Sequence, residues 1–269
     1  MLCRKMLNQS GERTLIAAIA PRMSSHIDGI YGLAFRNNKD LIRVAAQLFS
    51  LPFDFFVKAT GMSNLRQTTV EGFPILEINE DISVRVLLLS CLTDAYSELW
   101  SSEWNNKFPN LLWSKESPQL SCSTFTSLTP KWTVKTPLRT DYERRQALVE
   151  LDVLVSLALG ITLEQLIMLY KIQFPVLQGY EADTWYDANG RIVFTNNRSL
   201  TGVGVDRKTW ENAVSKINPG EKYVHKVVDN TMPGGPVERT IEYLAPFDRC
   251  DREKDYETAW KFFEEKYGK

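Results

Sequence analysis

Histidine and cysteine are scarce in this sequence, which limits the metal and nucleophile chemistry that it can support. The 269 residues include 2 histidines and 4 cysteines. The cysteines are far apart and form no CxxC pair, so a four-ligand zinc site is not expected; they are Cys3, Cys91, Cys122 and Cys250. His26 and His225 lack neighbours suited to a catalytic triad or a metal site. Cys91 falls in an apolar helical run, which indicates a small core residue.

Long apolar runs are also missing. No stretch approaches the roughly 20 apolar residues that a membrane-spanning helix needs. The N-terminus lacks the charged-then-apolar form of a signal peptide, so we expect a cytoplasmic protein with no membrane partner. The formal net charge is -1, and overall charge therefore gives no argument for a nucleic-acid partner. Locally, residues 1–76 are mildly basic, with nine Lys/Arg against five Asp/Glu, whereas residues 77–104 carry six acids against one Arg.

Several catalytic motifs are absent as well. Amino-group DNA methyltransferases need an (Asn/Asp/Ser)-Pro-Pro-aromatic tetrapeptide, and no Pro-Pro occurs in the sequence. There is no Walker loop and no GxSxG. The nearest approach to a glycine-rich cofactor loop, Gly202-Val-Gly204, lies in a polar stretch without a strong strand before it and indicates a plain turn. The residues therefore predict no catalytic, cofactor-binding or metal-binding site in this chain.

The most informative segment present is Leu51–Leu76. An apolar, aromatic run around Phe53–Val57 leads into a polar loop, and the chain then returns to an apolar Phe-Pro-Ile-Leu. The loop holds side chains that bind phosphates and base edges, namely Lys58, Thr60, Gly61, Ser63, Asn64, Arg66 and Gln67. DNA-reading loops combine cations for phosphates with amides and hydroxyls for bases. An ordinary polar surface loop between two core segments is the alternative.

The rest of the first part predicts two strands and two helices. Thr14–Ile19 and Ile27–Phe35 have the short apolar character of buried strands. Lys39–Leu51 and Asn79–Trp104 have helical periodicity, and the second predicts one long helix. Residues 105–139 contain four prolines and a Ser/Thr cluster, which predicts an irregular linker or surface arm.

The last part, residues 140–269, has clear local signals. Capping boxes at Thr140 and Thr162 predict helices that end at Leu159, before Gly160, and at about Phe174. Trp185–Thr195 predicts a β-hairpin with Asn189-Gly190 as a type I′ turn. The remaining expected elements are a helix at Arg207–Ile217, strands at Tyr223–Val228 and Thr240–Leu244, and a terminal helix at Tyr256–Tyr267. Together these elements predict an α+β fold with domains at 1–104 and 140–269.

Long stretches of the sequence resemble one family. RTLIAAIAP (Arg13–Pro21), His26 followed by LAF (Leu33–Phe35), PFDFFVKATGMSNLR (Pro52–Arg66) and GFPIL (Gly72–Leu76) are similar to the target-recognition region of large bacterial adenine-N6 DNA methyltransferases. The enzymes are those of DISARM-type and fused restriction–modification phage-defence systems. Leu151–Leu177, Tyr180–Thr195 and Tyr243–Phe263 extend the resemblance, which covers nearly the whole chain apart from 105–139.

The resemblance implies a role without catalysis in this chain. In that family a Rossmann-like domain binds S-adenosylmethionine and carries Asn-Pro-Pro-aromatic, and this sequence lacks that half. It implies the DNA-recognition part of an adenine-specific methyltransferase, with 1–104 as the target-recognition domain. S-adenosylmethionine is expected in the missing catalytic domain, and the implied partners are duplex DNA and a separate methyltransferase polypeptide. A split subunit, a truncated gene product and an excised domain all remain open.

The expected DNA contacts fall into three groups. Lys58 and Arg66 are predicted to contact phosphates or a guanine, and Asn64 and Gln67 to contact adenine. Thr60, Gly61 and Ser63 would let the backbone approach the duplex. Further contacts are expected from the preceding helix and from a second polar turn, through Lys39, Arg43, Arg22 and His26.

A non-enzymatic interaction protein, or a truncated gene remnant without DNA binding, is the alternative. The hairpin of helices at Thr140–Phe174 is rich in apolar residues and could dock a partner, although such a pattern is more often core. The two interpretations differ in salt dependence, because affinity based on phosphate contacts falls steeply with salt.

Overall fold

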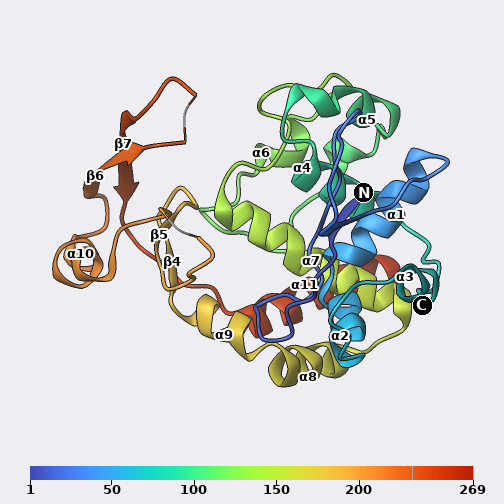
Figure 1. Ribbon diagram of the computed structural model, residues 1–269. Helices are drawn as coiled ribbons and strands as arrows, with labels where there is room; N and C mark the ends of the chain where they lie inside the picture. The colour runs from blue at the N-terminus through green and yellow to red at the C-terminus, as the bar shows by residue number, and fades with distance from the viewer. Residues whose placement is uncertain (201, 232, 269) are drawn as a thin grey trace.

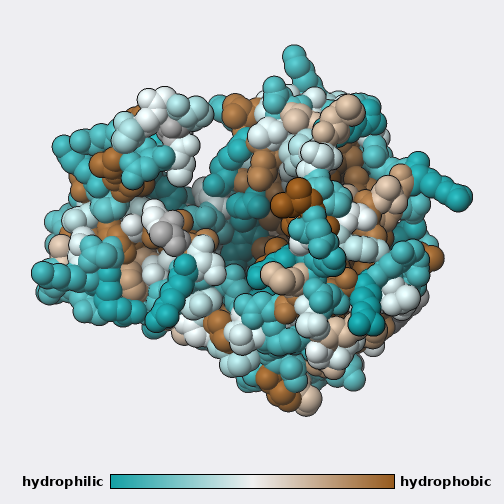
Figure 2. Space-filling model, in the orientation of Figure 1, coloured by the Kyte–Doolittle hydropathy of each residue, from teal (hydrophilic) through white to brown (hydrophobic). Residues whose placement is uncertain are grey.

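The computed structural model describes residues 1–200, 202–231 and 233–268. The chain has an α+β fold, as predicted, with a helical body and a smaller lobe that carries two-stranded sheets (Figure 1). The body also contains a small three-stranded sheet close to the N-terminus. A hydrophilic hollow separates the lobe from the upper part of the body in Figure 2.

The N-terminal sheet has the order β2-β1-β3, with β1 (Leu2–Arg4) at its centre and antiparallel to β2 (Ala17–Ala18) and β3 (Ile30–Gly32). The strands predicted at Thr14–Ile19 and Ile27–Phe35 are present but much shorter, and β1 was not predicted. The first is short because the main-chain N–H groups of Thr14 and Leu15 donate to the buried carboxylate of Asp54 and not to a neighbouring strand.

The apolar run around Phe53 is helical. Helix α1 (Asn38–Phe49) is followed directly by α2 (Leu51–Ala59), with Pro52 in the first turn, where its missing N–H costs nothing. A third, short helix, α3 (Gln67–Glu71), starts at the end of the polar stretch. The predicted loop is therefore shorter than expected, because Lys58 lies in the last turn of α2 and Gln67 is the first residue of α3.

The single helix predicted at Asn79–Trp104 is wrong. The chain forms α4 (Glu80–Ser90), a 3₁₀ turn at Asp94–Tyr96 and α5 (Ser97–Ser102). The break lies at Cys91, whose carbonyl accepts from the indole N–H of Trp132 at 2.8 Å. Arg139 likewise donates to the Leu92 carbonyl at 3.0 Å. Donors from a distant segment thus replace the helical hydrogen bonds that a continuous helix would need.

Residues 105–139 are irregular, as predicted, apart from a 3₁₀ turn at Phe108–Asn110 and α6 (Ser123–Thr126). They do not form a surface arm or a linker, however. Apolar side chains from this segment are buried in the main core, including Phe108, Trp113, Leu120, Phe125 and Leu138. The prolines prevent regular structure but not burial.

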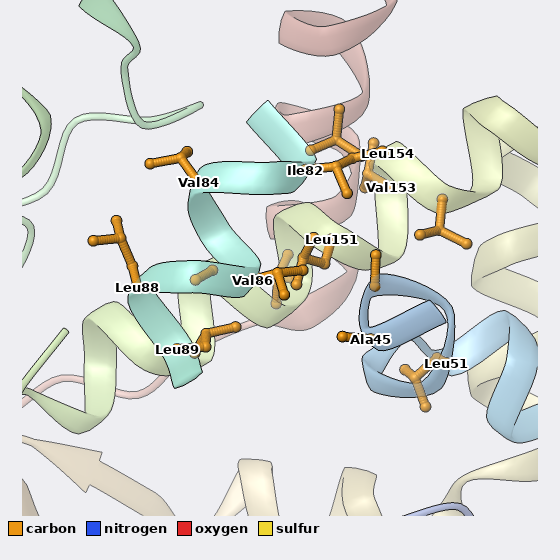
Figure 3. Packing of buried hydrophobic residues seen from close by; sticks show 14 of the residues in the cluster. Ala45, Leu51, Ile82, Val84, Val86, Leu88, Leu89, Leu151, Val153 and Leu154 are labelled. Carbon is orange, nitrogen blue, oxygen red and sulfur yellow. The ribbon is translucent and has the colours of Figure 1, made fainter. Parts of the chain in front are cut away.

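Helix α7 (Asp141–Leu159) is the centre of the body and packs against α1, α2, α4, α8 and α11 (Figures 1 and 3). Its predicted ends are confirmed, with Thr140 as N-cap and Gly160 at φ +70 as C-cap. Leu151, Val153 and Leu154 pack among side chains of α4 in Figure 3. One core cluster includes buried residues from Cys3 to Phe263, so the core is continuous across the border predicted between 104 and 140.

Two further helices cover the lower side of the body. The capping box predicted at Thr162 is confirmed at the start of α8 (Leu163–Gln173). Pro175 ends α8, as predicted, and it is also the first residue of α9 (Pro175–Ala182), a helix that was not predicted. The terminal helix α11 (Arg252–Tyr267) begins four residues before the predicted start, where Asp251 caps it.

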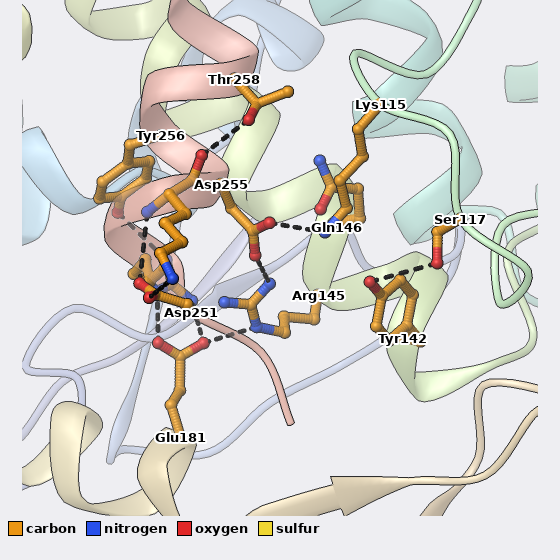
Figure 4. A network of polar contacts seen from close by, with 12 residues as sticks. Lys115, Ser117, Tyr142, Arg145, Gln146, Glu181, Asp251, Asp255, Tyr256 and Thr258 are labelled. Carbon is orange, nitrogen blue, oxygen red and sulfur yellow. Dashed lines mark hydrogen bonds and ion pairs between the residues drawn. The ribbon is translucent and has the colours of Figure 1, made fainter. Parts of the chain in front are cut away.

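A buried ionic network joins α7, α9 and α11 (Figure 4). The carboxylate of Glu181 accepts from Arg145 Nε at 2.7 Å and from Arg252 Nε at 2.8 Å. Arg145 also pairs with Asp255 at 2.6 Å, and Arg252 pairs with Asp152 at 3.0 Å. The network therefore holds the end of α9 against the two longest helices of the body.

The smaller lobe has its own core. Strands β4 (Thr184–Tyr186) and β5 (Ile192–Thr195) form the predicted hairpin, and β6 (Lys222–Asp229) pairs with β7 (Val237–Leu244). These sheets pack with α10 (Arg207–Asn212), which is followed by a 3₁₀ turn at Val214–Lys216. The central side chains of this second cluster are Val193, Phe194, Val205, Trp210, Val214 and Tyr243.

The turn of the β4–β5 hairpin differs from the prediction. A type I′ turn needs positive φ at both central residues. Gly190 has φ +78, but Met23 is the only non-glycine with positive φ among the described residues, so Asn189 does not meet the requirement. The N–H of Gly190 instead donates to the Asp187 carbonyl, and Asp187 also caps the turn through its side chain. The connection is a longer turn that ends in a left-handed glycine.

Candidate nucleic-acid interface

The polar stretch after α2 is held against the N-terminal sheet by its main chain. The N–H of Leu7 donates to the Ser63 carbonyl at 2.9 Å, and the N–H of Leu65 donates to the Lys5 carbonyl at 2.8 Å. Met6 and Asn64 form the antiparallel bridge between these two bonds. Ser63–Leu65 therefore extends the sheet along the continuation of β1, and this fixes the backbone from which Asn64 projects.

Side chains in this part of the sheet alternate between core and solvent. Cys3, Leu7 and Leu65 are buried, whereas Arg4 and Asn64 are exposed. Directly opposite residues of paired strands share a face. The positions on this side of the sheet form one surface, here called the outer sheet face, which includes the exposed Arg4, Met6, Gly32 and Asn64 and the half-buried Ile30. Arg66, two residues after Asn64 in extended backbone and exposed, continues this face. Successive positions along it are about 7 Å apart.

The second polar turn reaches the same face. A Cβ at Gly32 would lie 2.5 Å from Nε2 of His26, so the imidazole ring occupies the space above this glycine. The N–H of Lys5 donates to the Gly29 carbonyl, directly beside the bond between Lys5 and Leu65. The ends of the two predicted polar segments are thus neighbours along β1, and His26 shares a face with Asn64.

Charge on this surface comes from two arginines. Arg4 and Arg66 are exposed, and within the described ranges neither has a recorded ion pair or side-chain hydrogen bond. Lys5 is paired with Asp28, and the hydrogen bond from Lys5 lowers the pKa of that carboxyl. Arg22 is paired with Glu98 at 2.7 Å. Arg4 and Arg66 are therefore the cations of the outer sheet face that are available to an anion.

Other predicted contact residues point elsewhere. The ammonium of Lys58 lies 5.3 Å from the ring centroid of Phe174, toward α8 and away from the polar stretch. Arg43 pairs with Asp40 on its own helix at 2.7 Å. Lys39 lines a separate hollow beside α4 and α5, together with Glu80 and Glu103.

The remaining predicted residues serve the local backbone. The hydroxyl of Thr60 donates to the Val57 carbonyl at the end of α2, and Gly61 takes φ +64 after it. The amide of Gln67 donates to Glu71 at 2.6 Å. The structure therefore brings His26, Asn64 and Arg66 to one surface, with Ser63 next to Asn64 in the chain, and it does not bring Lys58, Lys39, Arg43 or Arg22 to this surface.

Arg4 and Met6 were missed from the sequence. The segment Leu2–Leu7 mixes apolar and basic residues without a clear alternation, and β1 itself is only three residues long. No local pattern in this segment distinguishes a strand from a disordered N-terminus. Only the pairing with Ser63–Leu65 reveals which of its side chains face solvent.

Several pockets lie outside this surface, and two of them differ clearly in polarity. A polar one of about 600 Å³ is lined by Tyr170, Trp185 and Arg252 among others, and an apolar one of about 540 Å³ lies between α2 and α8. The described residues contain no group of three or more His, Cys, Asp or Glu that could hold a metal ion. No helix among them combines the length and apolar character needed to cross a membrane.

Comparisons with known proteins returned no match for this chain, whether among family models, curated proteins or solved structures. The resemblance to adenine-N6 DNA methyltransferases therefore remains a prediction from the residues.

Proposed function

We propose that this chain is the DNA sequence-recognition part of an adenine-specific (N6) DNA methyltransferase from a bacterial restriction–modification or phage-defence system. The observation that carries the proposal is the outer sheet face, which Asn64 and Arg66 share with Arg4 on a backbone held by a β-strand. The family resemblance, which includes Asn64 and Arg66, agrees with this assignment.

The chemistry of the face fits a DNA groove. Asn64 is exposed, and its amide makes only a 3.4 Å bond to its neighbour Ser63. A free amide can bond the N6 and N7 positions of adenine at the same time. A free guanidinium can bind a guanine edge or a phosphate, which are the roles we assign to Arg66 and Arg4.

Methyl transfer is assigned to a catalytic domain that lies outside this sequence. The sequence contains no Pro-Pro, so the tetrapeptide that holds the target amino group is not here. S-adenosylmethionine would be bound by that catalytic domain, and no residue of this chain is given a catalytic role.

The first test is binding to duplex DNA. Duplexes selected by the chain from a random pool would be titrated by fluorescence anisotropy at several salt concentrations, and the affinity should fall steeply with salt. Asn64→Ala should relax specificity at one base pair, and Arg66→Ala should cost about 1–3 kcal/mol if it reads a guanine. Lys261→Ala, which removes an exposed cation from α11, is the matched control and should bind like the wild type. Equal losses from all three variants would contradict the assigned contacts.

The second test measures transfer of labelled methyl groups from S-adenosylmethionine to the selected duplex. The chain would be assayed alone and mixed with a methyltransferase polypeptide encoded beside it. Activity in the mixture alone supports the proposal, whereas activity of the chain alone would contradict the assignment of catalysis elsewhere.

A protein-interaction role for the helical hairpin is the second candidate. Most of its apolar residues are core, since Leu151, Val155 and Leu166 are fully buried. The apolar pocket between α2 and α8 nevertheless leaves Met168 and Ile172 of α8 exposed. This role is favoured if the wild-type chain selects no duplex and Ile172→Asp abolishes binding to a polypeptide partner.

A further inference from the structure

An apolar groove runs along the lower side of the body. The pocket of about 540 Å³ between α2 and α8 shares Leu159 and Ile161 with a larger one of about 1140 Å³, so the two form one continuous surface. This surface, here called the α2–α11 groove, is lined by α2, residues 73–79, the end of α7, α8 and the end of α11. Its larger part alone exceeds the roughly 300–1,000 Å³ of small-molecule sites, so the groove suits a larger ligand.

Apolar side chains reach solvent along this groove. Phe56 of α2 is 49% exposed, and Ile75, in the segment between α3 and α4, is 80% exposed. Met168 and Ile172 lie one turn apart on α8 and are also exposed. In Figure 2 apolar side chains appear at the lower edge of the molecule, where Figure 1 places α8. Exposed apolar side chains gathered in one groove indicate a surface that a partner covers.

The charged side chains that line the groove, within the described residues, are all acidic. They are Glu77, Glu164 and Glu264. No ion pair joins any of these three to a cation in the part of the chain that the structure describes. Two lysines close to them in the sequence are engaged by other acids, because Lys171 pairs with Glu253 at 2.7 Å and Lys266 pairs with Asp81 at 2.6 Å. The groove therefore presents negative charge beside apolar surface.

The end of α7 adds to this negative charge. The bonds that close the helix use the carbonyls of Ser156 and Leu157, whereas those of Ala158 and Leu159 accept no recorded hydrogen bond from the described residues after the helix. A Cβ at Gly160 would meet no atom within 4 Å, so this helix end is open to a ligand. The C-terminus of a helix carries a partial negative charge of roughly half a unit. Cations of a ligand would therefore be stabilised here.

These features favour a basic protein segment over other occupants. DNA and anionic lipid surfaces carry the same sign of charge as the groove and would be repelled. The lining elements are helices and an irregular segment, so a partner strand would find no sheet edge to extend. An amphipathic helix places apolar side chains at i, i+3, i+4 and i+7 on one face and can carry cations along the edges of that face.

We propose that the α2–α11 groove binds an amphipathic helix of a partner protein, with the apolar face of that helix on α2 and α8 and its lysines or arginines beside the three acids. The inference does not depend on DNA recognition, because the groove shares no residue with the outer sheet face. It specifies the partner that an interaction role of the helical hairpin requires. Affinity has two sources, apolar burial and charge, and each can be removed separately.

The probe is a fluorescein-labelled helical peptide of about 18 residues, built from leucine and lysine with the leucines on one face. A second peptide has the same pattern with glutamate in place of lysine. Anisotropy titrations use the full chain at several salt concentrations. The lysine peptide should bind at least about tenfold more tightly than the glutamate peptide, because only its charge complements the groove. This preference should shrink as salt rises.

Two double variants separate the sources of affinity. Met168→Gln with Ile172→Gln should weaken binding of the lysine peptide by about tenfold or more, because it removes apolar surface from the contact. Glu77→Gln with Glu264→Gln should weaken it by about threefold and should not weaken binding of the glutamate peptide.

Matched controls lie outside the groove. Glu116→Gln removes an exposed acid and Val134→Gln an exposed apolar side chain, and both should bind like the wild type. Ile172→Gln alone replaces the apolar double variant if the far-UV circular dichroism of the latter departs from that of the wild type. Absence of binding by the lysine peptide, equal affinity for the two peptides, or unchanged binding in both double variants overturns the proposal. Selection of duplex DNA tests the proposed function separately, so the two can fail independently.

Discussion

At the scale of single residues, Glu181 supplies the carboxylate that pairs with two buried arginines of the ionic network, Arg145 and Arg252. Burial opposes its ionisation, but the guanidinium groups of Arg252 and Arg145 outweigh burial and lower the pKa of Glu181 to about 2. Asp152 in the same network has the opposite shift, because burial raises its pKa. Because these two carboxyls shift in opposite directions, the contribution of Glu181 to the pH dependence of stability has to be measured with a variant at this position.

Glu181→Gln should remove stability that depends on pH. The ordinary pKa of the group is 4.5, so the stabilisation is fully present above that pH and is lost as pH falls toward 2. A depression of this size corresponds to a contribution on the order of 3 kcal/mol at neutral pH. Urea unfolding at pH 7, 4.5 and 3 measures this effect. Between pH 4.5 and pH 3 the free energy of unfolding should fall more in the wild type than in the variant. The exposed Glu257→Gln is the control, and equal slopes in Glu181→Gln and wild type would contradict the prediction.

At the scale of elements, residues 105–139 show that irregular structure can belong to the core. Phe125 is 2% exposed and makes an edge contact with Trp113, with ring centroids 5.1 Å apart. The guanidinium of the buried Arg85 lies 5.2 Å from its ring. The segment therefore closes the body over α4 and α7 and does not only connect two domains.

Phe125→Ala should destabilise the protein by about 3–5 kcal/mol, because it leaves a cavity and removes the cover over Arg85. Val134→Ala is the control within the same segment, since Val134 is 68% exposed, and it should change stability by less than about 0.5 kcal/mol. Denaturant unfolding measures both. A small effect from Phe125→Ala would mean that the segment behaves as a surface arm after all.

At the scale of the whole molecule, two core clusters of unequal size predict unequal local stability. The main cluster surrounds α7, whereas the second is confined to the lobe with β4, β5 and α10. The β6–β7 ribbon is two-stranded, and exposed side chains lie along its length, including Val224 and Val228. We therefore expect the β6–β7 ribbon to open more readily than the body.

Hydrogen exchange should reflect this division. We expect amides in the outer half of β6–β7 to exchange faster than those of α7 by roughly a hundredfold or more, because local opening costs less than global unfolding. Mass spectrometry of peptides from the two regions measures the ratio. Equal protection would mean that the lobe and the body unfold as one unit.

How much the sequence could predict depended on where each element obtains its hydrogen bonds. Helices capped by their own residues, at Thr140, Gly160 and Thr162, were predicted with correct ends. The break at Cys91 was not predicted, because the indole N–H that its carbonyl accepts from belongs to Trp132, 41 residues away. In the candidate site, Asn64, Arg66 and His26 were identified by residue type, whereas Arg4 was not.

The sequence by itself determined the α+β class, the capped helices, the β4–β5 hairpin and the residue types of the polar stretch, because these follow from caps, periodicity and turn chemistry within a few residues. Only the tertiary structure decided which polar side chains share a surface. Pairing of Lys5–Leu7 with Ser63–Leu65 placed Arg4 on the same face as Asn64 and Arg66, whereas the ammonium of Lys58 lies over the ring of Phe174. Contacts between segments so distant in the chain leave no local pattern, since each depends on the shape and charge of a partner that folding alone brings near.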